Sequence, residues 1–165
     1  MSVHAVFREV MGRNLSKNAK GFSHKDIQYA TALTYLIEKE FDMGLAYVCL
    51  TNYGLYSQDV VDEIDFERES GICSTPLKFE DEFYEYVKVI KKACKNQGDF
   101  GEVLIATAKY SMYQDALATD NTEDEFCDVW GKNTIKLDYR IGKTVLEKME
   151  KLKNKKFGSS QSQPE

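Results

Sequence analysis

Apolar residues recur every three to four positions along most of this chain, and short polar or glycine-containing breaks separate the runs. Such spacing places the apolar side chains on one face of an α-helix, whereas a strand would alternate them. The segments that carry this spacing or a helix-start signal are 3–13, 25–41, 57–70, 79–96, 102–117, one that begins at Thr122, and 137–152. The chain is therefore predicted to have an α+β, predominantly α-helical fold with about seven helices.

One stretch departs from the helical pattern. Residues 45–50 (LAYVCL) form a continuous apolar run between breakers, which is too short for a helix and is predicted to be a strand. Residues 52–54 (NYG) make a turn, and Ser57 is well placed to cap a helix that ends at Gly71. One or two short strands are expected in all. The helix after the turn is expected to bury three apolar side chains, Val60, Val61 and Ile64.

Length and charge favour a single globular domain over residues 1–153. The chain has 165 residues, 42% of them hydrophobic, which is enough for one core, while residues 154–165 are polar and are predicted to be a disordered tail. A net charge of −5 gives no general attraction to nucleic acid or to anionic lipid. No apolar run approaches the ~20 residues that would span a bilayer. The start of the chain lacks the pattern of a signal peptide, so we expect a cytoplasmic protein with no membrane partner.

The cysteines predict reduced thiols. Cys49, Cys73, Cys94 and Cys127 are far apart in the sequence, and no C-x-x-C occurs. At this length and cysteine density a disulfide framework is not expected, and packed cytosolic thiols are the simpler interpretation.

No catalytic, cofactor or metal motif is complete. The string Gly142-Lys143-Thr144 would need a glycine at position 137 to make a phosphate-binding loop, and that residue is Leu137. The only histidines are His4 and His24, and neither has metal-ligand spacing with other residues. A Cys–His pair can still meet in space, although no local signature supports one. We therefore expect no cofactor, no metal and no catalytic residue.

Charged and aromatic residues leave two interpretations open. The acids of 59–69 and 80–85 are those of a solvated helix face or of a surface that meets a basic partner. The lysines of 148–156 either compensate a helix dipole, which is the simpler interpretation, or contact phosphates without reading sequence. The tyrosines of the turn either pack locally or form a protein interface, where tyrosine is enriched. As the interface hypothesis we assign partner binding to Tyr53, Tyr56, Asp59, Asp62 and Glu63.

The string TNYGLYSQDVVDEIDFERESGI (residues 51–72) resembles the Panacea-type domain of phage-associated, antitoxin-like proteins. Shared features are the L-x-Y-L type helix around Leu33–Leu36, the turn with Tyr53, Gly54, Tyr56 and Ser57, and the helix end with Glu69, Gly71 and Ile72. Residues 104–114 (LIATAKYSMYQ) are similar to a later helix of that family, so the resemblance covers about residues 26–150. Leu55 stands where the family carries proline. The resemblance implies a helical α+β fold with a winged-helix-like element, protein binding, and no catalytic residues.

The expected function is that of a non-catalytic intracellular protein-binding module, phage- or prophage-derived, which neutralises or adapts a partner such as a toxin or a host factor. An alternative is a winged-helix-like nucleic-acid-binding regulator. Against it, Arg68 is the only basic residue between Asp59 and Cys73, whereas recognition helices contact phosphates through Lys and Arg. A small enzyme of unrecognised type is a third alternative.

Overall fold

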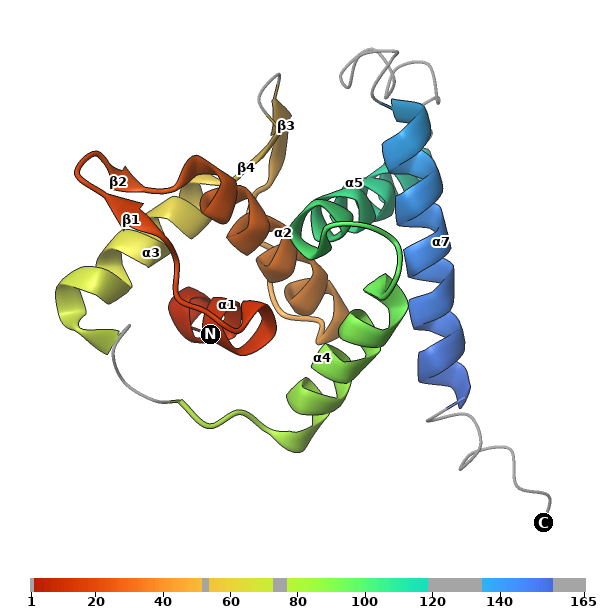
Figure 1. Cartoon of the computed structure of the whole chain (residues 1–165), viewed down its shortest axis with the longest axis horizontal. Coiled ribbons are helices and arrows are strands. Elements are labelled where there is room, and N and C mark those ends of the chain that lie inside the picture. Colours follow the sequence, from red (N-terminus) through yellow and green to blue (C-terminus); the bar gives the residue numbers. More distant parts are fainter. Residues whose placement is uncertain (1, 52–53, 73–76, 119–134, 156–165) are drawn as a thin grey trace.

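The computed structural model describes residues 2–51, 54–72, 77–118 and 135–155. Within these ranges the chain forms six α-helices and four short strands (Figure 1). The helices are α1 (Val3–Met11), α2 (His24–Glu40), α3 (Gln58–Ser70), α4 (Asp81–Cys94), α5 (Phe100–Ala118) and α7 (Ile135–Lys153). The strands pair as two antiparallel hairpins, β1 (Lys17–Asn18) with β2 (Gly21–Phe22) and β3 (Cys49–Thr51) with β4 (Gly54–Tyr56).

The predominantly helical α+β fold predicted from the sequence is confirmed. The described residues contain six helices instead of seven, because the segment expected to begin at Thr122 lies outside them. Residues 156–165 of the predicted disordered tail also lie outside. The predicted strand–turn–helix is present as the β3–β4 hairpin followed by α3.

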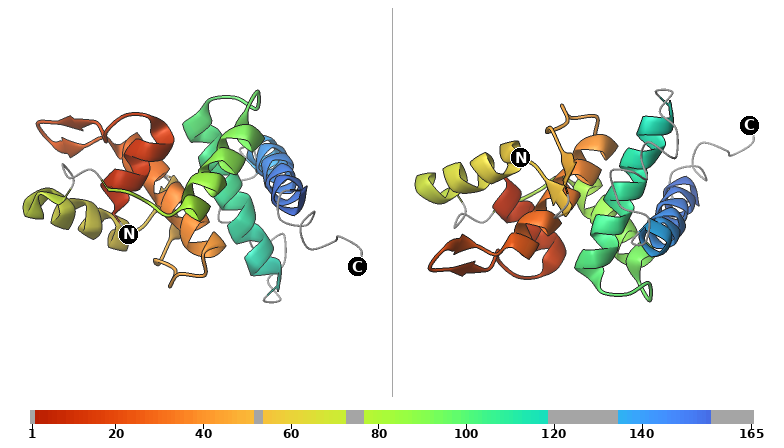
Figure 2. Two further views of the ribbon diagram at one scale, coloured as in Figure 1. Left: turned by 90° about the horizontal axis from the view of Figure 1, so that it is seen from below. Right: turned by 90° about the horizontal axis from the view of Figure 1, so that it is seen from above.

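Helix α2 lies in the middle of the molecule, and most of its circumference is therefore buried. Ser23 begins the helix by accepting a hydrogen bond from the Asp26 amide at 3.4 Å, and Leu33, Leu36 and Ile37 are core residues. Helices α1 and α3 and the β1–β2 hairpin lie on one side of α2, while α4, α5 and α7 lie on the other (Figure 2). Helices α3 and α7 therefore occupy opposite ends of the molecule (Figure 1).

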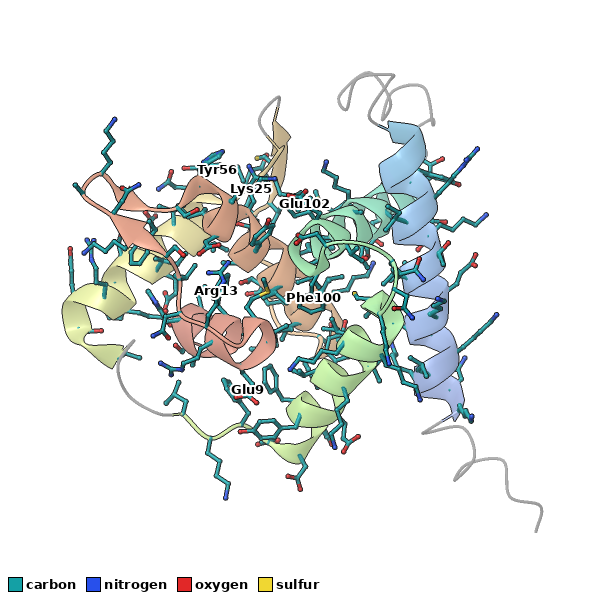
Figure 3. The ribbon with its side chains drawn as sticks, in the orientation of Figure 1. Glu9, Arg13, Lys25, Tyr56, Phe100 and Glu102 are labelled. Atoms are coloured by element: carbon teal, nitrogen blue, oxygen red, sulfur yellow. The ribbon has the colours of Figure 1, made fainter. Side chains whose placement is uncertain are left out.

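Polar contacts at the start of α2 and of α5 join the central helix to one of the two sides. Lys25 of α2 forms an ion pair with Glu102 of α5, and the two side chains lie beside each other in Figure 3. Tyr29 donates a hydrogen bond to the same carboxylate at 3.2 Å. At Gly101 a Cβ atom would lie 2.5 Å from the Tyr29 ring, so any larger residue there would require this ring to move.

The sequence Gly142-Lys143-Thr144 lies within α7, where it serves helix packing. A Cβ atom on Gly142 would lie 2.4 Å from the carbonyl oxygen of Ala106 and 2.7 Å from the Cβ of Tyr110. No real side chain makes contacts this short, so the glycine is what lets α7 approach α5. Next to it, the rings of Tyr110 and Tyr139 meet edge to face with centroids 5.1 Å apart.

The prediction of a strand over residues 45–50 was wrong in its extent. Strand β3 begins only at Cys49, and residues 43–48 form no ladder. The reason is that two carboxylates take the amides of this segment. Glu38 accepts from the Ala46 amide at 2.7 Å, and Asp59 accepts from the Tyr47 amide at 3.0 Å. Side chains thus satisfy the groups that a neighbouring strand would otherwise bind.

Part of the polar stretch 14–21, which lies between the first two predicted helical segments, contributes to the β1–β2 hairpin. The Asn18 side chain accepts a hydrogen bond from the Lys20 amide at 2.8 Å, and Gly21 has a φ of +124°, a conformation that favours glycine. Phe22 fixes the hairpin to the helices, because its ring meets the His4 ring at 5.4 Å and the Arg68 guanidinium at 5.6 Å.

A buried carboxylate joins the end of α1 to the start of α2. Asp26 accepts two hydrogen bonds from the Arg13 guanidinium, at 2.7 and 2.8 Å, and one from the Ser16 amide at 2.7 Å. Burial alone would raise the pKa of Asp26, but these hydrogen bonds and the charge of Arg13 outweigh burial and leave its pKa lowered.

Asp26→Asn should lower the free energy of unfolding at neutral pH by about 2 kcal/mol, since hydrogen bonds to charged groups contribute ~1.5–3 kcal/mol. The folded carboxyl has the lower pKa, so its contribution is complete above the ordinary value near ~3.9 and is lost as pH falls through the folded value. Urea unfolding of both proteins at several pH values measures this. The gap between the two should shrink below about pH 4, and a gap that widens there would contradict the assignment.

Candidate protein-binding surface

Helix α3 begins and ends where the sequence predicts. Ser57 Oγ accepts from the Val60 amide at 3.3 Å, and Gly71 closes the helix with a φ of +78°. Val60 and Ile64 are buried, whereas Val61 is only half-buried. One face of α3 therefore contacts the core, and the opposite face is exposed to solvent.

A buried acid fixes the position of α3 on α1. Glu67 is 1% exposed, and its carboxylate accepts from the amides of Val3 at 2.7 Å and of His4 at 3.0 Å. These amides have no acceptor within α1, because they lie in its first turn. The His4 ring also bonds to the Ile64 carbonyl at 3.0 Å. The sequence placed Glu67 among acids of a solvated face or of a surface that meets a basic partner, and the structure places it instead in the contact between α1 and α3.

On the solvent-facing side of α3, one aromatic residue and four acids form what is called here the α3 outer face: Phe66 with Asp59, Asp62, Glu63 and Glu69. All five side chains are exposed, and Phe66 is 59% exposed. Gln58, Arg68 and Ser70 of the same helix are exposed as well. Asp62 and Glu63 precede Phe66 by four and three positions and Glu69 follows it by three, so all three are its neighbours on the helix surface. A large apolar side chain is thus displayed at the centre of an acidic face.

The predicted site residues are partly brought together. Tyr56 is half-buried, and its hydroxyl donates to the Gln58 side chain, which in turn donates to Asp62 at 2.9 Å. Tyr56 and Asp62 therefore belong to one polar chain. Asp59, Asp62 and Glu63 are exposed, as the interface hypothesis needs. Tyr53 lies outside the described residues.

An exposed apolar segment adjoins the start of α3 and was not predicted. Met43, Leu45 and Tyr47 are 40%, 53% and 75% exposed. Their backbone is fixed by the carboxylates of Glu38 and Asp59, and burial raises the pKa of Glu38.

The exposure of Phe66 could have been predicted from the sequence. Phe66 lies two positions after Ile64, about 200° around the helix and away from the core.

A second polar cluster lies between α2, α5 and α7, around a hollow of about 590 Å³. Lys39 donates to Ser111 at 2.7 Å and to Asp115 at 2.9 Å, and Tyr35 donates to Asp115 at 2.7 Å. Burial and the bond to Asp115 raise the pKa of Tyr35. At the other edge, Lys153 pairs with Glu40 at 2.6 Å. These bonds join helices to one another.

Cys49 and Cys94 are free thiols, and burial raises the pKa of Cys94 to about 12. Among the residues with described positions, no three His, Cys, Asp or Glu side chains gather where they could hold a metal ion. None of the described helices is long and apolar enough to cross a membrane.

Comparison with known proteins finds no match among protein families, curated proteins or solved structures. The resemblance to Panacea-type domains therefore stays a prediction. Any assignment of function has to rest on the geometry of the surface described above.

Proposed function

We propose that this chain is a non-catalytic protein-binding module that acts in the cytoplasm by stoichiometric binding to a partner protein through the α3 outer face. The partner would be a toxin or a host factor that the module neutralises or adapts, as expected of an antitoxin-like, phage- or prophage-derived protein. The observation that carries the proposal is Phe66, a large apolar side chain that is 59% exposed at the centre of an acidic helix face.

The contacts of α3 favour recognition by a rigid surface. Glu67 fixes the helix to α1 and Ser57 caps its start, so Phe66 is presented by a helix that needs no ordering on binding. Aromatic residues are enriched at the centres of interfaces, while acids around them steer a basic partner and raise its association rate. The surface thus fits a partner with an apolar pocket edged by Lys or Arg.

The same charges argue against the nucleic-acid alternative. Asp59, Asp62, Glu63 and Glu69 would all face the phosphates if α3 were a recognition helix, and like charges repel. Arg68, the basic residue of the helix, pairs with Asp65 at 3.7 Å.

Phe66→Ala should weaken partner binding by about 2 kcal/mol, roughly thirtyfold, because truncating a central aromatic anchor typically costs this much. Wild-type protein is first used to capture partners from host lysate, and the captured protein is purified for calorimetry. Leu77→Ala, which truncates an exposed apolar residue outside the α3 outer face, is the matched control and should bind as wild type does.

Two results would overturn the proposal. One is a purified partner that binds Phe66→Ala and wild type equally well while circular dichroism shows both to be folded. The other is capture of nucleic acid alone, with binding that weakens steeply as salt rises.

A further inference from the structure

A hollow of about 440 Å³ lies between α4 and α7, at the end of the molecule away from α3. It is lined by Val89 and Leu152, which are apolar, and by three lysines, Lys88, Lys92 and Lys155. The three lysines are exposed, and the Lys88 side chain is 72% exposed although it pairs with Glu85 at 3.4 Å. The hollow thus combines apolar lining with a positive edge.

This hollow is complementary to the α3 outer face in apolar character and in charge. Phe66 is an apolar side chain among four acids, whereas the hollow is an apolar space among three lysines. A cavity of about 150 Å³ is enough for a benzene ring, so a volume of about 440 Å³ accommodates a phenyl side chain. Opposite charges around both features would align them and favour their encounter.

The two features cannot meet within one molecule, because α3 and α7 lie at opposite ends of the fold (Figures 1 and 2). They can meet only between molecules. We propose that a second copy of this chain occupies the hollow, with its Phe66 between Val89 and Leu152 and its acids against Lys88, Lys92 and Lys155. Such a contact is heterologous, so each copy keeps one unused feature, and head-to-tail assembly can continue.

The contact is small, because one aromatic side chain and a few ion pairs fall short of the ~1,200 Å² of a stable interface. Association should therefore be weak and salt-sensitive. It does not depend on the proposed function. If the proposed function and this inference both hold, the partner protein and the second copy compete for the α3 outer face. Partner binding would then dissociate the assembly.

Sedimentation velocity tests the proposal on the full chain, from about 10 μM to 1 mM, in low salt and near 1 M salt, where the Debye length falls to about 3 Å. For wild type we expect a mean mass that rises with concentration in low salt and stays monomeric in high salt. Phe66→Ala and the double variant Lys88→Glu/Lys92→Glu should each remain monomeric. Lys17→Glu/Lys20→Glu, which makes the same charge change on the β1–β2 hairpin, should associate as wild type does.

Mixing the two variants that should remain monomeric distinguishes a head-to-tail contact from other modes of self-association. Phe66→Ala keeps an intact hollow and Lys88→Glu/Lys92→Glu keeps an intact Phe66, so the mixture should form a one-to-one dimer that grows no further. A wild type that stays monomeric throughout overturns the proposal, as does a mixture that fails to form the dimer. Monomeric wild type whose Lys92 signals shift in NMR on adding polyglutamate or an oligonucleotide overturns it too, because the hollow then holds an acidic polymer.

Discussion

Glu67→Ala should lower the free energy of unfolding by about 4 kcal/mol. The substitution leaves the amides of Val3 and His4 buried without an acceptor, and each unsatisfied buried donor costs ~1–3 kcal/mol. It also removes a negative charge from the N-terminus of α1, where the helix dipole favours an anion. Urea unfolding monitored by circular dichroism measures the loss.

Two further variants separate the role of the carboxylate from that of any acid on α3. Glu67→Gln keeps one acceptor oxygen in nearly the same shape, so its loss should be about half that of alanine. Glu69→Ala removes an exposed acid two positions away and should change stability by no more than about 0.5 kcal/mol. If Glu67→Ala destabilises the protein as little as Glu69→Ala does, the contact between α1 and α3 contributes nothing to the free energy of unfolding.

Gly142→Ala should destabilise the fold by about 3 kcal/mol, although alanine is the better helix former by ~1 kcal/mol. The added methyl would lie 2.4 Å from the Ala106 carbonyl oxygen, and backbone cannot rotate away as a flexible side chain can. Helix α7 must then move off α5, and overpacking of this kind costs ~1–3 kcal/mol or more.

Gly44→Ala is the matched control, because a Cβ atom there would meet nothing within 4 Å. It should leave the unfolding midpoint nearly unchanged under the same conditions. Stabilisation by Gly142→Ala, as helix propensity alone predicts, would mean that α5 and α7 are not in close contact at this position.

Helices were predictable here because periodicity depends on neighbours along the chain. Ser57, Val60, Ile64 and Gly71 lie where local capping and spacing rules place them. The contacts of Glu67 could not be predicted by such local rules. It is in register with Val60 and Ile64, but its partners are 63 and 64 positions away, and no local pattern names them.

The strand prediction was wrong over residues 45–48 for the same reason. Apolar content alone suggested a ladder, while the amides of Ala46 and Tyr47 are taken by carboxylates from α2 and α3. Of the candidate site, the exposure of Asp59, Asp62 and Glu63 followed from their helical positions. Phe66 could have been assigned to the surface by the same rule, because it lies two positions after the core residue Ile64.

The anchoring of α3 through Glu67 also has a consequence for the exchange of backbone hydrogens with solvent. Amides in the first turn of a helix usually exchange fast, because they have no carbonyl acceptor four residues earlier. The Val3 and His4 amides instead bind a buried carboxylate from α3, so they are protected only while the two helices stay in contact. The exchange rates of these two amides thus report how often α3, with Phe66 on its outer face, separates from the rest of the fold.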